Sequence, residues 1–233
     1  MATTAGAQTK YDIWVGGVQV TSANASNITG GDIKSGTVKY DATENELILR
    51  NATITRSGTS KQGIRNQVAG LTITFFGTNT ITTDNSCALR CDANTYLWMM
   101  PNSKTTFTEK QQEAFYVTGG KSLFITGGSR AELYVNSTNE YAVEGEKGTE
   151  TVTFQGGPVV TLNGKKGSLV KLGKVVFTES QNKSTSVTLK ATNNSSYPQV
   201  QNVAAWEEEG YNHIAAPAYK ATHPVHPMLH GDL

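Results

Sequence analysis

A repeat of about 26 residues runs through most of this chain and limits the folds open to it. Each unit opens with a small residue followed by an apolar one, continues with an apolar-x-apolar pair and closes with a third apolar position. The opening pairs are Gly63-Ile64, Ala88-Leu89, Ala114-Phe115, Ala142-Val143 and Ser168-Leu169. Repetition at a fixed period of about 20–50 residues indicates a solenoid, a propeller or another repeat array.

Within a unit the paired apolar positions are two residues apart, which is the period of a β-strand with one buried side. The second marks are Leu71-x-Ile73, Leu97-x-Met99, Leu123-x-Ile125, Val152-x-Phe154 and Val175-x-Phe177. The third marks are Ile81, Phe107, Leu133, Val160 and Val187. Turn residues such as Gly77-Thr78-Asn79 separate the marks, so each unit is predicted to form three short strands around a three-faced coil.

A unit of this size cannot bury its apolar side alone, but stacked units pair every strand above and below and align the apolar side chains in internal columns. One predicted column holds Ile73, Met99, Ile125 and Phe154. The sequence therefore predicts an all-β fold, a single right-handed parallel β-helix (solenoid) with coils of about 26 residues and three short strands per coil. A β-sandwich is the alternative, but its hairpins would not keep a register between distant segments.

The repeat also sets the expected boundaries. Residues 1–10 are predicted to be the remnant of a signal peptide or a disordered N-terminus, residues 11–200 the β-helix with its N-terminal cap, and residues 201–233 a C-terminal cap or a partly ordered tail. Ala5-Gly6-Ala7 has the pattern of a signal cleavage site after Ala7, although the charged and apolar regions that precede such a site are missing. We expect a secreted or cell-surface protein; a frayed terminus is the other interpretation.

The composition limits which kinds of partner this protein is expected to bind. A net charge of +1 and the lack of a dense Lys/Arg run argue against nucleic acid, and no apolar run of about 18 residues predicts a membrane span. Cys87 and Cys91 would lie about 13 Å apart on one strand, so they are expected to be free buried thiols unless a turn separates them. No residue decides the oligomeric state.

Two N-terminal segments carry a family resemblance. They read Tyr11-Asp12-Ile13-Trp14-Val15-Gly16-Gly17-Val18-Gln19-Val20-Thr21 with Asn24, and Val38-x-Tyr40-Asp41-x-x-x-Asn45-x-Leu47-x-Leu49-x-Asn51-Ala52-x-Ile54. Both resemble the opening of secreted bacterial β-helix proteins described as carbohydrate-binding domain-containing, a group similar to pectin-binding β-helices. The resemblance covers residues 11–54, and it implies a β-helix, export and a carbohydrate ligand.

The repeats contain few groups suited to catalysis. All histidines follow the last repeat: His213, His223, His226 and His230. The carboxylates that a glycosidase pair or a lyase-type calcium site would need lie near turns, where acids are also expected for solubility: Asp84, Asp92, Glu109, Glu113, Glu132 and Glu140. We therefore expect no enzyme activity, no catalytic residue and no metal site. Calcium is the one cofactor left open, and a pectate-lyase-like enzyme is the weaker alternative.

Two outward columns indicate how a ligand binds. Trp98 and Phe124 are predicted to lie one above the other, about 4.8 Å apart, as a flat strip for the apolar face of a sugar. Arg65 and Arg90 on adjacent coils, with Tyr116 beside them, suit the carboxylates of uronate sugars. The sequence thus predicts a non-catalytic protein that binds polysaccharide, acidic ones included, through these five residues. The alternatives are plain aromatic packing for the rings and solvated arginines next to turn acids for the second column. For function, the alternative is a structural or adhesive surface protein that binds a protein partner.

Overall fold

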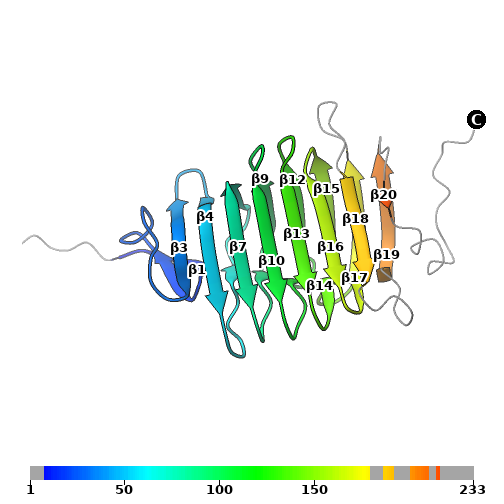
Figure 1. The fold of residues 1–233 in the computed structure, drawn as a ribbon, viewed down its shortest axis with the longest axis horizontal. Coiled ribbons are helices and arrows are strands. Elements are labelled where there is room, and N and C mark those ends of the chain that lie inside the picture. Colours follow the sequence, from blue (N-terminus) through cyan, green and yellow to red (C-terminus); the bar gives the residue numbers. More distant parts are fainter. Residues whose placement is uncertain (1–7, 179–185, 192–199, 210–213, 216–233) are drawn as a thin grey trace, which may run out of the picture.

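The computed structural model describes residues 8–178, 186–191, 200–209 and 214–215. Every helix or strand assigned among these residues is a β-strand, and the strands stack into a parallel β-solenoid of about five turns (Figure 1). Successive coils lie about 27 residues apart. The all-β fold and the stacking of three-stranded coils predicted from the repeat are therefore confirmed.

Three faces run along the solenoid, each made of strands that pair in parallel with the equivalent strand of the next coil. Face 1 contains β5 (Ile64–Asn66), β8 (Leu89–Cys91), β11 (Phe115–Val117), β14 (Tyr141–Gly145) and the first part of β17 (Gly167–Thr178). Face 2 contains β6 (Leu71–Phe76), β9 (Thr95–Met99), β12 (Ser122–Gly127), β15 (Thr151–Gly156) and the second part of β17. Face 3 contains β7 (Thr78–Thr83), β10 (Lys104–Glu109), β13 (Glu132–Ser137), β16 (Val159–Gly164) and β18 (Ser186–Ala191), and its strands lie side by side in Figure 1.

Antiparallel strands occupy the N-terminal end, where the sequence placed a cap. β1 (Lys10–Val15) and β2 (Val18–Thr21) form a hairpin, and β1 also pairs antiparallel with β5. β3 (Ile33–Asp41) pairs antiparallel with β4 (Glu46–Arg56), which in turn pairs in parallel with β6 and β7. The parallel stack thus begins at β4, because β3 pairs with β4 in the antiparallel direction, with Val38 opposite Leu49.

The stack continues beyond residue 200, where the sequence placed the start of a C-terminal cap or tail. β19 (Val200–Glu209) pairs in parallel with β17, and β20 (Ile214–Ala215) pairs with β18. Trp206 of β19 is buried, with its ring centroid 4.8 Å from that of Phe177. The proposed cleavage site and all histidines lie outside the described residues.

Apolar columns fill the interior, and phenylalanines connect the faces. Phe107 of face 3 packs edge-on against Phe75 of face 2 at 5.8 Å and against Phe115 of face 1 at 4.8 Å, and all three side chains are fully buried. Burying a side chain of this size stabilises the fold by about 1.5–3 kcal/mol relative to leaving it exposed. This interior holds the faces rigid, so that outward side chains keep fixed spacings.

One column differs from the prediction. Leu97, and not Met99, lies opposite Ile73 and Ile125, while Met99 lies opposite Phe75. A shift of two residues keeps every side chain on its side of the strand, so the apolar alternation is the same in either register.

A buried polar residue occupies the resulting position in the leucine column. Thr95 lies opposite Leu71 and Leu123 and is fully buried. Asn66 Nδ2 donates a hydrogen bond to Thr95 Oγ1 at 2.9 Å, and Thr95 Oγ1 donates to the carbonyl oxygen of Ala93 at 2.8 Å. These bonds satisfy a threonine at a site that the sequence pattern assigns to an apolar residue.

Replacing Thr95 by valine should lower the free energy of unfolding by about 1–3 kcal/mol, because the buried amide of Asn66 loses its acceptor. Urea denaturation measures the change. Thr106→Val is the matched control: Thr106 is an outward residue of β10, and its substitution should change the stability by less than about 0.5 kcal/mol. A Thr95→Val protein as stable as the wild type would show that these hydrogen bonds do not help to fix the register.

Candidate ligand-binding surfaces

Three outward aromatic side chains form a group on face 2, which we call the aromatic patch: Tyr96, Trp98 and Phe124. Tyr96 of β9 lies opposite Phe124 of β12, and their rings stack with centroids 4.5 Å apart and planes 8° apart. Trp98 lies two residues further along β9, on the same side of the strand, and is 47% exposed. The patch therefore presents a pair of parallel, stacked rings and an exposed indole to solvent.

The predicted stacking of Trp98 on Phe124 is wrong. Trp98 lies opposite Thr74 and Thr126, and the neighbour of Phe124 is Tyr96. The error has the same cause as the displaced internal column, because the outward residues of β9 shift together with its inward ones. Tyr96 was missed for this reason, although its alternation with Trp98 marks both rings as outward in either register.

Polar and cationic groups border the aromatic patch. Thr74 and Thr126 lie on either side of Trp98, and Gln155 follows Thr126 on the next coil. On the N-terminal side, the guanidinium of Arg50 lies 4.0 Å from the ring centroid of Phe76, which shields that ring. The surface thus combines apolar rings with hydroxyl and amide groups that can bond a polar ligand.

A second set of outward residues follows face 1. Arg65 lies opposite Arg90, and Arg90 lies opposite Tyr116, as the repeat predicted. Trp14 of β1 extends the column on the other side of Arg65. The guanidinium of Arg65 lies 5.5 Å from the Trp14 ring centroid, and that of Arg90 lies 5.1 Å from the Tyr116 ring centroid. Trp14 was not predicted here, because the repeat does not indicate antiparallel pairing of a capping strand.

Asp92 neutralises much of the positive charge in this column. Nε of Arg65 donates to Asp92 Oδ2 at 2.7 Å, and Nε of Arg90 donates to Asp92 Oδ1 at 2.8 Å. A single carboxylate thus bridges two like charges on adjacent coils. Asp92, a candidate catalytic or calcium-binding acid in the sequence, here orients the arginines, and less charge is left to attract a uronate.

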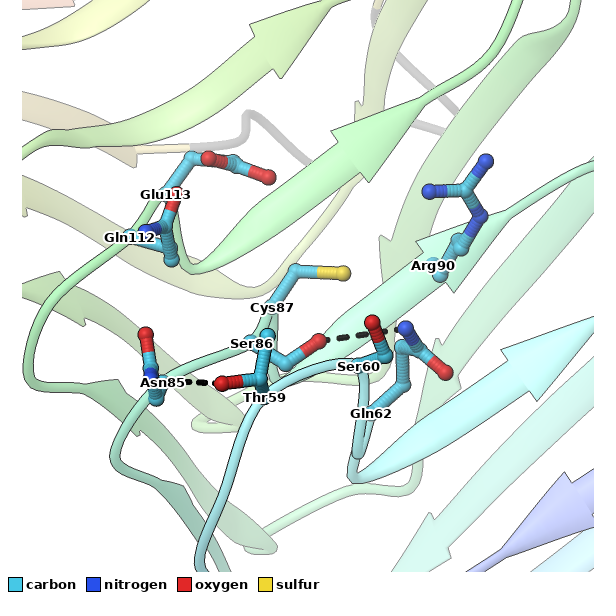
Figure 2. Close-up of a pocket in the computed structure, with 9 residues that line it drawn as sticks. All are labelled: Thr59, Ser60, Gln62, Asn85, Ser86, Cys87, Arg90, Gln112 and Glu113. Carbon is cyan, nitrogen blue, oxygen red and sulfur yellow. Dashed lines mark hydrogen bonds between the residues drawn. The ribbon is translucent and has the colours of Figure 1, made fainter.

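A polar pocket of about 250 Å³ lies where face 3 turns into face 1, and we call it the corner pocket (Figure 2). Its lining comes from the β4–β5 turn, the β7–β8 turn with β8, and the β10–β11 turn: Thr59, Ser60, Gln62, Asn85, Ser86, Cys87, Arg90, Gln112 and Glu113. Three consecutive coils therefore build one site, which no single repeat contains.

Hydrogen bonds between coils hold the pocket wall. Asn85 Nδ2 donates to Thr59 Oγ1 at 3.0 Å, and Gln62 Nε2 donates to Ser86 Oγ at 3.1 Å. Figure 2 shows both bonds, with Arg90 on one side of the pocket and Glu113 on the other. The polar side chains are thus fixed by contacts within the protein, which lowers the cost of ordering them around a ligand.

Glu113 supplies the carboxyl group of the pocket lining, and the pKa of this group is raised. Burial, together with the nearby carboxylates of Glu144, Glu109 and Glu140, raises its pKa to about 7. Each of these effects disfavours the charged form. At neutral pH this carboxyl group is therefore shared between its protonated and ionised forms, and it can both donate and accept hydrogen bonds.

Both cysteines are free and buried, as expected. Burial raises the pKa of the Cys91 thiol to about 12 and the pKa of the Cys87 thiol further above its ordinary value. The thiolate is the reactive form, and burial disfavours it in both side chains at neutral pH.

The other candidate acids are held by separate contacts. Asp84 accepts the backbone N–H of Gly58 at 2.8 Å, which lowers the pKa of Asp84. Glu140 pairs with Lys166 at 2.5 Å, and Glu132 accepts the hydroxyl of Tyr134 at 3.0 Å. The buried carboxylate of Glu109 accepts backbone N–H groups of the β10–β11 turn. Within the described part of the chain, no three His, Cys, Asp or Glu side chains are grouped to hold a metal ion.

Comparisons with known proteins supply no relative: no family model, no curated protein and no solved structure matches this chain. The β-helix implied by the N-terminal resemblance is present, whereas its carbohydrate-binding, secreted and bacterial attributes gain no support from the comparisons. Among the described residues there is no helix long and apolar enough to cross a membrane.

Proposed function

We propose that this protein is a non-catalytic polysaccharide-binding β-solenoid that is secreted or held at the cell surface. The aromatic patch carries the proposal: stacked rings of Tyr96 and Phe124 beside an indole that is 47% exposed. Large exposed aromatic side chains grouped on one face mark an interaction surface, because water solvates them poorly.

The chemistry of the patch suits a sugar polymer. The C–H face of a sugar ring is apolar and packs on an aromatic ring, while its hydroxyl groups need hydrogen-bonding partners at the edge. Thr126 beside Trp98 and Gln155 on the following coil provide such partners, whereas the hydroxyl of Thr74 is buried and donates to Glu46. Because face 2 repeats coil after coil, a chain molecule can lie along it without a deep cleft, which suits binding without bond cleavage.

Wild-type protein should be retarded in native gels that contain a bound polysaccharide, and Trp98→Ala should lose at least about tenfold in affinity, or about 1.4 kcal/mol. Affinity electrophoresis through gels of neutral and acidic polysaccharides, with and without calcium, measures this effect. The melting temperature of Trp98→Ala should stay close to the wild-type value, because the indole is exposed. Tyr134→Ala is the matched control, since Tyr134 is an outward aromatic residue on face 3.

Other outcomes of this experiment would contradict the proposal or favour a different function. Equal retardation of Trp98→Ala and wild type would remove the aromatic patch from the proposal. Free migration through every gel would favour a structural or adhesive protein that uses the same exposed rings to bind a protein partner. Calcium-dependent shortening of the polymer would indicate a lyase.

A further inference from the structure

The corner pocket lies on a different part of the solenoid from the aromatic patch and has a different chemistry. The patch is on face 2, whereas the pocket lies between face 3 and face 1. Its lining supplies hydroxyl groups from Thr59, Ser60 and Ser86 and amide groups from Gln62, Asn85 and Gln112. Most of these groups can offer both a donor and an acceptor, which is also the property of a sugar hydroxyl.

The charged groups of the pocket are largely compensated. Arg90 is held between the carboxylate of Asp92, at 2.8 Å, and the ring of Tyr116, with 5.1 Å between guanidinium and centroid. Burial among other carboxylates disfavours the ionised form of Glu113, whose pKa lies at about 7. A strongly anionic or cationic ligand would therefore find little net charge of opposite sign, so the pocket favours an uncharged polar ligand.

The volume of the pocket and the fixed positions of its wall side chains further limit which ligands fit. A volume of about 250 Å³ lies below the range of about 300–1,000 Å³ found for drug-sized ligands, so the pocket fits one ring and not an oligomer. The bonds from Asn85 to Thr59 and from Gln62 to Ser86 fix the wall before any ligand arrives. Ser86 accepts in that bond, so its own hydroxyl proton is left to donate.

We propose that the corner pocket binds a single uncharged, hydroxyl-rich sugar unit, as a terminal or pendant unit of a polysaccharide. Arg90 donates to the sugar oxygens, Glu113 bonds a hydroxyl group from the opposite side, and Gln62 and Ser86 bond the hydroxyl groups between them. The polymeric origin of the unit rests on the proposed function, whereas the pocket itself does not depend on the aromatic patch.

Saturation-transfer NMR with the methyl glycosides of glucose, galactose, mannose, xylose and N-acetylglucosamine tests the proposal directly. At least one probe should bind, and Gln112→Trp should weaken that binding by tenfold or more, because the indole fills the pocket. The fold should tolerate this change, since Gln112 is exposed and bonds through its backbone: its N–H donates to Glu109, and its carbonyl accepts the Ser137 hydroxyl at 2.6 Å. Gln111→Trp, next to the pocket but outside its lining, should bind like wild type.

A second pair of variants tests the chemistry of the wall without adding bulk. Glu113→Leu keeps the approximate shape and removes a carboxyl group that is costly to bury, so it should fold and still lose binding by tenfold or more. Glu113→Gln keeps a donor and an acceptor and should stay within a few-fold of wild type.

The outcomes separate this proposal from the proposed function. Three results would overturn the proposal that the corner pocket binds a sugar unit. They are equal probe binding by Gln112→Trp and Gln111→Trp, preferential binding of glucuronate over every uncharged probe, and no probe binding at all. If polysaccharide gels still retard the protein in that last case, polymer binding through the aromatic patch stands. Probe binding that Gln112→Trp abolishes would support the pocket even if every polysaccharide gel lets the protein pass.

Discussion

Replacing Phe107 by alanine should lower the free energy of unfolding by about 3–5 kcal/mol. Phe107 is fully buried and is the ring at which the faces meet, edge-on to Phe75 at 5.8 Å and to Phe115 at 4.8 Å. Truncation leaves a cavity lined by Ile81 and Val135 of the neighbouring coils, whose strands are held in place by their own ladders and cannot collapse to fill it. Urea denaturation followed by circular dichroism measures the loss.

Tyr134→Ala serves as the control for this prediction. Tyr134 lies on the next coil of the same face but points outward, so its truncation should cost less than about 1 kcal/mol. A loss below about 1 kcal/mol in Phe107→Ala would contradict a continuous, closely packed core. It would mean that this coil can repack or unfold without its neighbours, as weakly coupled repeats do.

Glu113→Gln should stabilise the protein by about 1–3 kcal/mol at pH 8 and change its stability little at pH 4. In the unfolded chain Glu113 releases its proton near the ordinary pKa of 4.5, whereas the folded protein keeps the proton up to about pH 7. Between these values the folded state binds more protons, so raising the pH lowers the free energy of unfolding. Above pH 7 the folded state must hold an ionised carboxylate near Glu144, Glu109 and Glu140, a cost that glutamine avoids.

Melting curves of wild type and Glu113→Gln between pH 4 and 8 test this prediction. The difference between the two proteins should grow through the interval from about pH 4.5 to 7. Glu44→Gln is the control, because Glu44 is exposed in the turn between β3 and β4, and its difference from wild type should not change across that interval. A constant difference for Glu113→Gln as well would show that this carboxyl group is ionised in the folded protein well below pH 7.

The two candidate sites differ in how they meet a sugar. The aromatic patch offers an exposed indole beside a stacked ring pair, so under our proposal its contacts depend on the shape of a chain that lies along face 2. The corner pocket offers hydrogen bonds in fixed directions, so under our proposal it selects a particular unit of that chain. Because Asp92 bridges Arg65 and Arg90, neither site depends on a strong positive field, and uncharged glycans are suitable ligands for both.

The sequence by itself determined the architecture. A period of about 26 residues, with apolar side chains two apart inside each unit, leaves stacking of the units as the way to bury these side chains. The same logic identified Arg65, Arg90 and Tyr116 as neighbours. Each face 1 strand begins directly after a small residue of the repeat, Gly63, Ala88 or Ala114, and these small residues recur at a regular spacing.

Only the tertiary structure decided the register of β9, the place of Trp14 and the corner pocket. A two-residue slip leaves the inside and outside of a strand unchanged, so the sequence pattern does not distinguish Leu97 from Met99 as the partner of Ile73. In the folded stack Leu97 is that partner, and Thr95 lies opposite Leu71, where it bonds Asn66. Trp14 reaches face 1 through an antiparallel pairing that no repeat encodes. The pocket joins turns from three coils. Its shape is set by turn lengths and by side-chain contacts between coils, which are properties of the folded stack and not of any one unit.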